Sequence, residues 1–195
     1  MSLVVFGLVT SNPDKLAEIV AMLPSGFDVE RLDLGEVAET GTSFEENAEI
    51  KALAGLELRS LALGEDSGLE VDALGGAPGV YSKRYAESDS ARIQRVLSEL
   101  HEEDNRRARF VTVIAMAQRG APTQFFRGEV EGYISWEPRG ARGFGYDPIF
   151  VPDEGDGRTF AQMSREEKSS LSHRGRAIAA LVSHVRNSLD SEGPY

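Results

Sequence analysis

Two carboxylates, Glu39 and Asp66, lie in polar segments at the ends of expected helices or strands. Glu39 precedes a helix that begins near Thr42 or Ser43, and Asp66 follows a strand expected over 61–65. Mg²⁺ prefers one or two carboxylates, with water and phosphate oxygens completing its shell, so the acidic residues around the start of this helix could hold it. Asp66 is separately well placed for a metal or for orienting water. Both positions also have a structural interpretation, because acidic residues are favoured at helix N-termini and Asp-Ser-Gly is a common turn sequence.

The geometry around Asp66 depends on whether the strand ends before it. On the sequence alone we expect a turn over 66–68, followed by a further strand over 69–73. If strand geometry persists instead, Glu65 and Asp66 point to opposite faces and cannot both enter one site. Asp66 would then lie near the carboxyl end of a buried strand, where open α/β sheets bind ligands.

The segment 10–15, Thr-Ser-Asn-Pro-Asp-Lys, combines a helix start with a lysine. Asn12 is a favoured N-cap and Pro13 a favoured first helical residue. A helix N-terminus offers N–H donors and the positive end of the dipole to an anion such as phosphate, and Lys15 adds a charge one turn in. An ordinary cap with a surface lysine is the competing interpretation. Lys51 shares a helix face with the asparagine four residues before it.

Glycines alternate with aromatic residues over 138–148. Such backbone can approach a flat ring closely, and Phe144 and Tyr146 could stack against that ring. His173 and Arg174 stand together at the start of the last expected helix. His173 is as readily a capping or packing histidine as a ligand contact.

The elements that must position these residues alternate between strand and helix patterns. This mixed order predicts an α/β fold: a mixed twisted sheet with flanking helices, forming two lobes around a central cleft. We expect one domain over 1–195, with a flexible tail over 190–195. Strands are expected over 3–9, 27–34, 61–65, 69–73, 110–117, 125–136 and 149–151, and helices from 13, 42–43 and 88–89 and over 172–189.

Composition excludes several classes of protein. The 195 residues include no cysteine, which rules out thiolate metal sites and thiol nucleophiles. The formal net charge of −11 argues against nucleic-acid and anionic-membrane partners, although a few local cations suffice for a nucleotide. The apolar run 3–9 is too short for a membrane span and lacks the flanks of a signal peptide, so we expect a cytoplasmic protein.

Taken in order, these polar segments resemble the inosine triphosphate pyrophosphatase family, whose members hydrolyse non-canonical purine nucleoside triphosphates. The similarity spans nearly the whole chain, and DSGLEVDALGGAPG and GFGYDP followed by SHR are its most specific parts. The matching blocks are TSNPDK at 10–15, ETGTSFEENAEIKA at 39–52, EDSGLEVDALGGAPGVYSKRYA at 65–86, RRARF at 106–110, GEVEGYI at 128–134, PRGARGFGYDPIF at 138–150 and EEKSSLSHRGRA at 166–177.

The resemblance implies a mechanism in which Mg²⁺ holds the triphosphate while water attacks the α-phosphorus, releasing pyrophosphate and a nucleoside monophosphate. ITP, dITP and XTP are the implied substrates, and a homodimer with the family's anticodon-binding-like architecture is expected. Asp66 would accept a proton, and Glu39 with Asp66 would bind the metal. Lys51 and Lys168 would face phosphate, and Ser67 would help to position the substrate. The phosphates would be cradled by Thr10, Ser11, Asn12, Pro13, Asp14 and Lys15. The base pocket would be formed by Phe144, Gly145, Tyr146, Asp147, His173 and Arg174.

Several alternatives stay open. If Asp66 binds Mg²⁺ directly, the cation lowers the pKa of that carboxyl, so Asp66 could orient water rather than deprotonate it. The related Maf-like pyrophosphatases share the architecture, but the GFGYDP and SHR blocks argue against them. A nucleotide-binding regulator without hydrolysis predicts the loss of Glu39 or Asp66, and both are present. A purely structural domain requires every polar segment to be coincidental.

Overall fold

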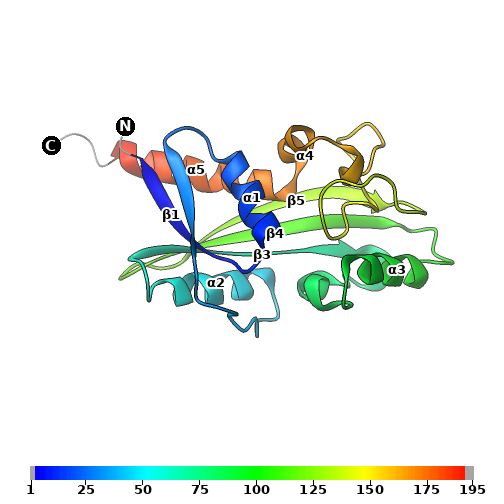
Figure 1. Cartoon of the computed structure of the whole chain (residues 1–195), viewed down its shortest axis with the longest axis horizontal. Helices are drawn as coiled ribbons and strands as arrows, with labels where there is room; N and C mark the ends of the chain where they lie inside the picture. The colour runs from blue at the N-terminus through cyan, green and yellow to red at the C-terminus, as the bar shows by residue number, and fades with distance from the viewer. Residues whose placement is uncertain (1–2, 192–195) are drawn as a thin grey trace. The chain divides into compact units, whose positions relative to one another are not determined.

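The structure, a computed structural model, describes residues 3–191 and contains one six-stranded sheet (Figure 1). The strand order is β2-β1-β3-β4-β5-β6. β1 is parallel to both of its neighbours, β2 and β3, whereas β5 is antiparallel to β6, so the predicted α/β fold with a mixed sheet is confirmed. The strands are β1 Val4–Val9, β2 Phe27–Leu32, β3 Leu61–Val71, β4 Arg107–Gln118, β5 Gln124–Ile134 and β6 Phe150–Pro152.

The helices begin where the sequence supplies caps. Asn12, Ser43 and Ser88 each accept hydrogen bonds from N–H groups of the first turn that follows. The expected elements did not include α4, although Ser164 and Glu167 form a capping box at its start. The α-helices are α1 Pro13–Met22, α2 Phe44–Gly55, α3 Asp89–Glu99, α4 Arg165–Leu171 and α5 His173–Ser191, and the 3₁₀ helices are η1 Asp72–Leu74, η2 Gly79–Arg84 and η3 Phe160–Gln162.

The predicted turn over 66–68 is wrong, because β3 runs without interruption from Leu61 to Val71. β3 lies between β1 and β4 in the sheet, and hydrogen bonding to neighbouring strands overrides the local turn preference of Asp-Ser-Gly. Successive side chains of β3 therefore point to opposite faces of the sheet, as expected for a continuous strand. Glu65 contacts Lys15 of α1, whereas Asp66 contacts Lys51 of α2, so the two carboxylates point to opposite faces.

The chain divides into two compact units, the first of which comprises the described residues of 1–66, 112–128 and 174–195. In this unit α1 and α5 cover one face of the strands and α2 covers the other (Figure 1). Ile19 of α1 and Ile178 and Leu181 of α5 pack with Phe6, Leu8 and Leu63 of the strands. Burial of these side chains supplies the main stabilisation of the unit.

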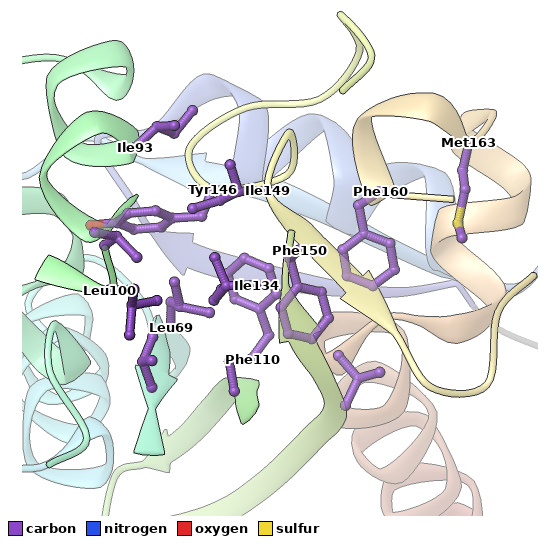
Figure 2. Packing of buried hydrophobic residues seen from close by; sticks show 14 residues of the cluster. Leu69, Ile93, Leu100, Phe110, Ile134, Tyr146, Ile149, Phe150, Phe160 and Met163 are labelled. Atoms are coloured by element: carbon purple, nitrogen blue, oxygen red, sulfur yellow. The ribbon is translucent and has the colours of Figure 1, made fainter. Parts of the chain in front are cut away.

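The second unit comprises 67–111 and 129–173 and has its own hydrophobic cluster (Figure 2). Three aromatic rings lie at its centre: the Phe110 centroid is 4.6 Å from that of Phe150 and 6.1 Å from that of Phe160. Ile93 and Leu100 from the region of α3 and Ile134 from β5 belong to the same cluster. This packing fixes the segment 138–148, which contributes Tyr146 to the cluster.

The predicted tail, 190–195, falls largely outside the described residues, since 192–195 are not described and Asp190 and Ser191 are the last residues of α5. Among helices of the described part of the chain, none has the length and apolar character needed to cross a membrane.

A close approach between α2 and β3 depends on Gly64. A Cβ atom built at this position would lie 2.0 Å from the Ala48 carbonyl oxygen and 2.5 Å from the Ala52 nitrogen. Both atoms belong to helix backbone, which cannot move aside without shifting α2. The absence of a side chain at residue 64 therefore sets the distance between the helix that carries Lys51 and the strand that carries Asp66.

We predict that Gly64→Ala destabilises the protein by about 3 kcal/mol or more, because the added methyl group forces α2 away from β3. Chemical denaturation measures the change in the free energy of unfolding. Ser60→Ala, at an exposed position just before the same strand, is the control and should be near neutral. Equal stability of the Gly64→Ala variant and the wild type would contradict the close approach.

Candidate functional site

The Asp66 carboxylate is buried on the α2 face of β3, with a side chain that is 7% exposed. Its Oδ1 lies 3.3 Å from the Lys51 Nζ, and its Oδ2 accepts a hydrogen bond of 3.2 Å from the Asn47 Nδ2. Asn47 is itself fixed, since its Oδ1 accepts from the Gly41 N–H at 2.8 Å. Burial raises the pKa of Asp66, against the opposing effect of Lys51.

Glu39 lies next to the same lysine. The Lys51 Nζ is 2.8 Å from the Glu39 Oε1, so the ammonium group stands between the two carboxylates predicted to bind metal. Burial lowers the pKa of Lys51, but the carboxylates of Asp66, Glu39 and Glu65 together outweigh that effect and raise it. The structure therefore brings Glu39, Lys51 and Asp66 together.

The two carboxylates fit a magnesium ion that is completed by substrate. Within residues 3–191, no group of three or more histidine, cysteine, aspartate or glutamate side chains could hold a metal by itself. A pair of carboxylates around one cation suits Mg²⁺, which commonly takes one or two carboxylates and keeps water and phosphate oxygens as its other ligands. Glu39 and Asp66 supply such a pair, one on each side of the Lys51 ammonium.

The segment 10–15 forms a capped helix start. The Asn12 Oδ1 accepts from the N–H groups of Asp14 at 2.9 Å and Lys15 at 3.3 Å, and the Asn12 N–H donates to the Thr10 Oγ1 at 3.1 Å. The cap predicted from Asn12 and Pro13 is confirmed. These backbone N–H groups are bonded to the cap, so the Lys15 ammonium is the positive charge that this segment offers to an anion. Lys15 is not a surface lysine, because its side chain is only 17% exposed.

Glu65, which the sequence did not mark as a site residue, pairs with Lys15. The Lys15 Nζ is 2.8 Å from the Glu65 Oε2, and the Arg174 Nη2 is 3.0 Å from the Glu65 Oε1. Burial alone would raise the pKa of Glu65, but Lys15 and Arg174 hold it well below its usual range. Burial lowers the pKa of Lys15, while Glu65 acts in the opposite direction. Arg174, predicted near the base, is thus part of a buried ion-pair network of the first unit.

In the second unit, Asp147 organises the glycine-rich segment. Its Oδ2 accepts from the Phe144 N–H at 2.9 Å and from the Lys168 Nζ at 2.6 Å, and both charged side chains are buried. The Lys168 Nζ lies 4.9 Å from the centroid of the Phe144 ring. Lys168, expected to face phosphate, is therefore paired with residues predicted to contact the base.

The two aromatic residues of this segment have different surroundings. Tyr146 is 4% exposed and lies within the hydrophobic cluster, where its hydroxyl group donates to the Ser82 carbonyl oxygen at 2.9 Å (Figure 2). Burial raises the pKa of Tyr146. Phe144 is partly exposed, so its ring is the one that could stack on a ligand. The alternation of glycine and aromatic residues could not distinguish these two environments.

The remaining predicted residues of this unit have varied environments. His173 is buried, with its ring stacked 4.7 Å from the Phe110 ring, which favours the packing interpretation. Ser67 follows Asp66 in β3 and is partly exposed. The Gly145 N–H donates to the Asp89 Oδ2 at 2.7 Å. Asp89 was expected only as a helix cap, and no local sequence pattern indicated its contact with a residue 56 positions away.

The fold is that of an α/β protein with a mixed six-stranded sheet, and comparison with known sequences defines its family. The model of the Ham1 family matches residues 6–184, so the chain belongs to the Ham1 family. The family membership predicted from the motif blocks is thereby confirmed.

Curated relatives and solved structures agree with this assignment. The chain is 49% identical over 185 residues to a dITP/XTP pyrophosphatase of Symbiobacterium thermophilum, covering 91% of this chain and 93% of that protein. It is 46% identical over 202 residues to a dITP/XTP pyrophosphatase of Bartonella quintana, covering 91% and 94%. A HAM1 protein from Coxiella burnetii has a similar structure, with a TM-score of 0.85, 37% identity and coverage of 95% of this chain and 100% of that one.

We predict that Gly143→Ala displaces the Asp147 carboxylate. Gly143 has φ +73°, and a Cβ atom there would lie 2.0 Å from the Asp147 Oδ2. Gly157→Ala is the matched control, because Gly157 has φ +86° with nothing within 4 Å of its Cβ position. Both variants carry the cost of a left-handed backbone, about 1 to 2 kcal/mol. Gly143→Ala should lose about 1 to 3 kcal/mol more in urea unfolding, and equal losses would contradict the crowding at Asp147.

Proposed function

We propose that the protein hydrolyses the non-canonical purine nucleoside triphosphates ITP, dITP and XTP to the nucleoside monophosphate and pyrophosphate, with Mg²⁺ as cofactor. The observation that carries this proposal is the convergence of Glu39 and Asp66 on Lys51, 2.8 and 3.3 Å from its ammonium nitrogen. The names of the curated relatives, dITP/XTP pyrophosphatases, support the same reaction. The family match gives no support to the Maf-like alternative.

The proposed chemistry has two parts, metal binding by two carboxylates and acceptance of a proton by one of them. Glu39 and Asp66 would hold Mg²⁺, which when bound neutralises phosphate charge and polarises the phosphoryl oxygens. Asp66 would accept a proton from the attacking water or orient that water. A raised pKa improves a carboxylate as a proton acceptor at neutral pH, and burial raises that of Asp66. Asn47 and Lys51 bind one oxygen each and so fix the plane of the carboxylate.

The phosphate contacts are assigned to two lysines, a serine and the segment that begins α1. We propose that Lys15 and Lys51 contact the triphosphate, with Ser67 and the segment 10–14 completing its binding. The ammonium groups of both lysines are paired with carboxylates, so each is already positioned before substrate arrives. Water serves as nucleophile in this scheme, consistent with a sequence that contains no cysteine.

Base recognition is assigned to Phe144, Gly145, Tyr146, Asp147 and Lys168. The Phe144 ring would stack on the purine, and the Lys168 ammonium would donate to a 6-oxo group. Adenine presents an amino donor at that position, so it would leave buried partners unsatisfied and be rejected. GTP shares the 6-oxo group and must be excluded at its 2-amino group. Because His173 and Arg174 are buried, we assign them support of the pocket rather than direct contact.

The same proposal extends to the cellular context. We propose that residues 1–195 act as one pyrophosphatase domain, assembled as a homodimer. The cytoplasm is the proposed location, since the nucleotide pool that such an enzyme cleanses is there. Small-molecule nucleoside triphosphates, rather than nucleic acid or membrane, are the proposed partners, and the net charge of −11 supports this choice.

The deciding experiment assays purified protein with Mg²⁺ against ITP, XTP, dITP, GTP and ATP and identifies the phosphate product. We expect pyrophosphate as the product, and at least about 100-fold higher kcat/KM for ITP and XTP than for ATP. Removal of divalent metal with EDTA should abolish turnover, and added Mg²⁺ should restore it. Orthophosphate as product, or equal rates with ATP, would overturn the proposed function, and binding of ITP without turnover would favour the regulator.

We predict that Asp66→Asn lowers kcat for ITP by about 100-fold or more, because the amide cannot accept a proton or bind metal comparably. The fold should persist, since an amide still accepts from Lys51 and occupies the same volume. Asp33→Asn, at a carboxylate that is 76% exposed, is the matched control and should retain wild-type kcat. Steady-state kinetics with circular dichroism checks both variants, and near-normal turnover in Asp66→Asn would remove this residue from the mechanism.

A further inference from the structure

Glu65 is a buried carboxylate to which the proposed reaction assigns no task. It precedes Asp66 in β3 but points to the opposite face, toward α1 and α5. Its side chain is 1% exposed. A buried ionised group is costly unless it is paired, so its contacts indicate why it is tolerated there.

Glu65 belongs to a network of four charged residues, the others being Lys15, Arg174 and Glu18. Its Oε2 is 2.8 Å from the Lys15 Nζ, and its Oε1 accepts from the Nη2 and Nε of Arg174 at 3.0 and 3.3 Å. The other side of the Arg174 guanidinium, Nη1, donates to Glu18. The formal charges of the four side chains sum to zero. All four residues belong to the first unit, from α1, β3 and α5.

The four side chains of this network differ in their exposure to solvent. The side chains of Glu65 and Arg174 are 1% and 2% exposed, that of Glu18 is 10% exposed, and that of Lys15 is 17% exposed. Glu65 and Arg174 are thus the most buried members, and Lys15 is the most exposed one. Arg174 is suited to this position because its planar guanidinium bonds two carboxylates in fixed directions.

We propose that Glu65 is a positioning residue that holds the Lys15 ammonium in place for phosphate, with Arg174 fixing the carboxylate from behind. This inference rests on the proposed function, in which Lys15 contacts the triphosphate. A free lysine side chain has about 2 kcal/mol of rotamer entropy to lose on binding a ligand. Glu65 restricts those rotamers when the protein folds, so less entropy remains to be lost when phosphate binds.

A merely structural role makes a different prediction. If Glu65 only balances buried charge, its loss should weaken the fold and affect phosphate binding to the same extent whether or not Lys15 is present. If Glu65 acts through Lys15, its loss should weaken phosphate binding only while the lysine is present. A double-mutant cycle separates the two roles.

The test measures the affinity of the full-length protein for inorganic pyrophosphate with Mg²⁺, by calorimetry, in the wild type, Glu65→Gln, Lys15→Met and the double variant. In the protein that retains Lys15, we expect Glu65→Gln to weaken pyrophosphate binding by about 10-fold. In the Lys15→Met background, the same change should weaken binding by less than about 2-fold. Kinetics with ITP should show the loss chiefly in KM. Equal losses in both backgrounds, or no loss in either, would overturn the proposal.

Glu18→Gln is the matched control, because it removes the other buried carboxylate of Arg174 and leaves the Lys15–Glu65 pair in place. It should lower the denaturation midpoint as Glu65→Gln does but keep pyrophosphate affinity within about 2-fold of the wild type. Equal affinity losses in the two variants would also overturn the proposal.

Where Glu65→Gln does not fold, Glu65→Asp replaces it in the same cycle, since it keeps the charge and shortens the reach by one methylene group. Glu65→Asp should weaken pyrophosphate binding only in the protein that retains Lys15. Because binding of pyrophosphate is read without turnover, these outcomes remain distinct from those of the nucleotide assay, which tests the proposed function itself.

Discussion

The structure depends above all on the pairing of charges that have been removed from water. Asp66 and Glu65 are consecutive buried carboxylates in one strand, and neither could stay ionised there without cations on its own face. The alternation of the strand gives each a separate partner, Lys51 from α2 and Lys15 from α1. The helices that flank β3 are therefore held to it by charge as well as by apolar packing.

The cations that perform this task explain an odd feature of the composition. The chain has only four lysines, and Lys15, Lys51 and Lys168 are each ion-paired with a carboxylate and largely removed from solvent. The net charge of −11 is therefore a poor guide to the local charge at these sites, where lysines are concentrated. Arginine provides most of the surface ion pairs, such as that of Arg107 with Asp153.

Much of the fold and part of the site could be predicted from local sequence. Caps such as Asn12 and apolar spacing located most helices and strands, since these signals act within one turn or one strand. The break expected at Asp66 was wrong because hydrogen bonding to neighbouring strands outweighed local turn preference. Glu65 and Asp89 were missed because their partners, Arg174 and Gly145, lie 109 and 56 positions away and no local pattern encodes such contacts.

The buried ion pairs among Lys15, Glu18, Glu65 and Arg174 also constrain how the sequence can change over time. Any single replacement that alters a charge leaves an unbalanced group in the interior, whereas paired replacements can keep the sum at zero. Substitutions at α1, β3 and the start of α5 should therefore be correlated across relatives, although these segments are far apart in the chain. The four residues would then change together, because a charge change at one position would be retained only with a matching change at another.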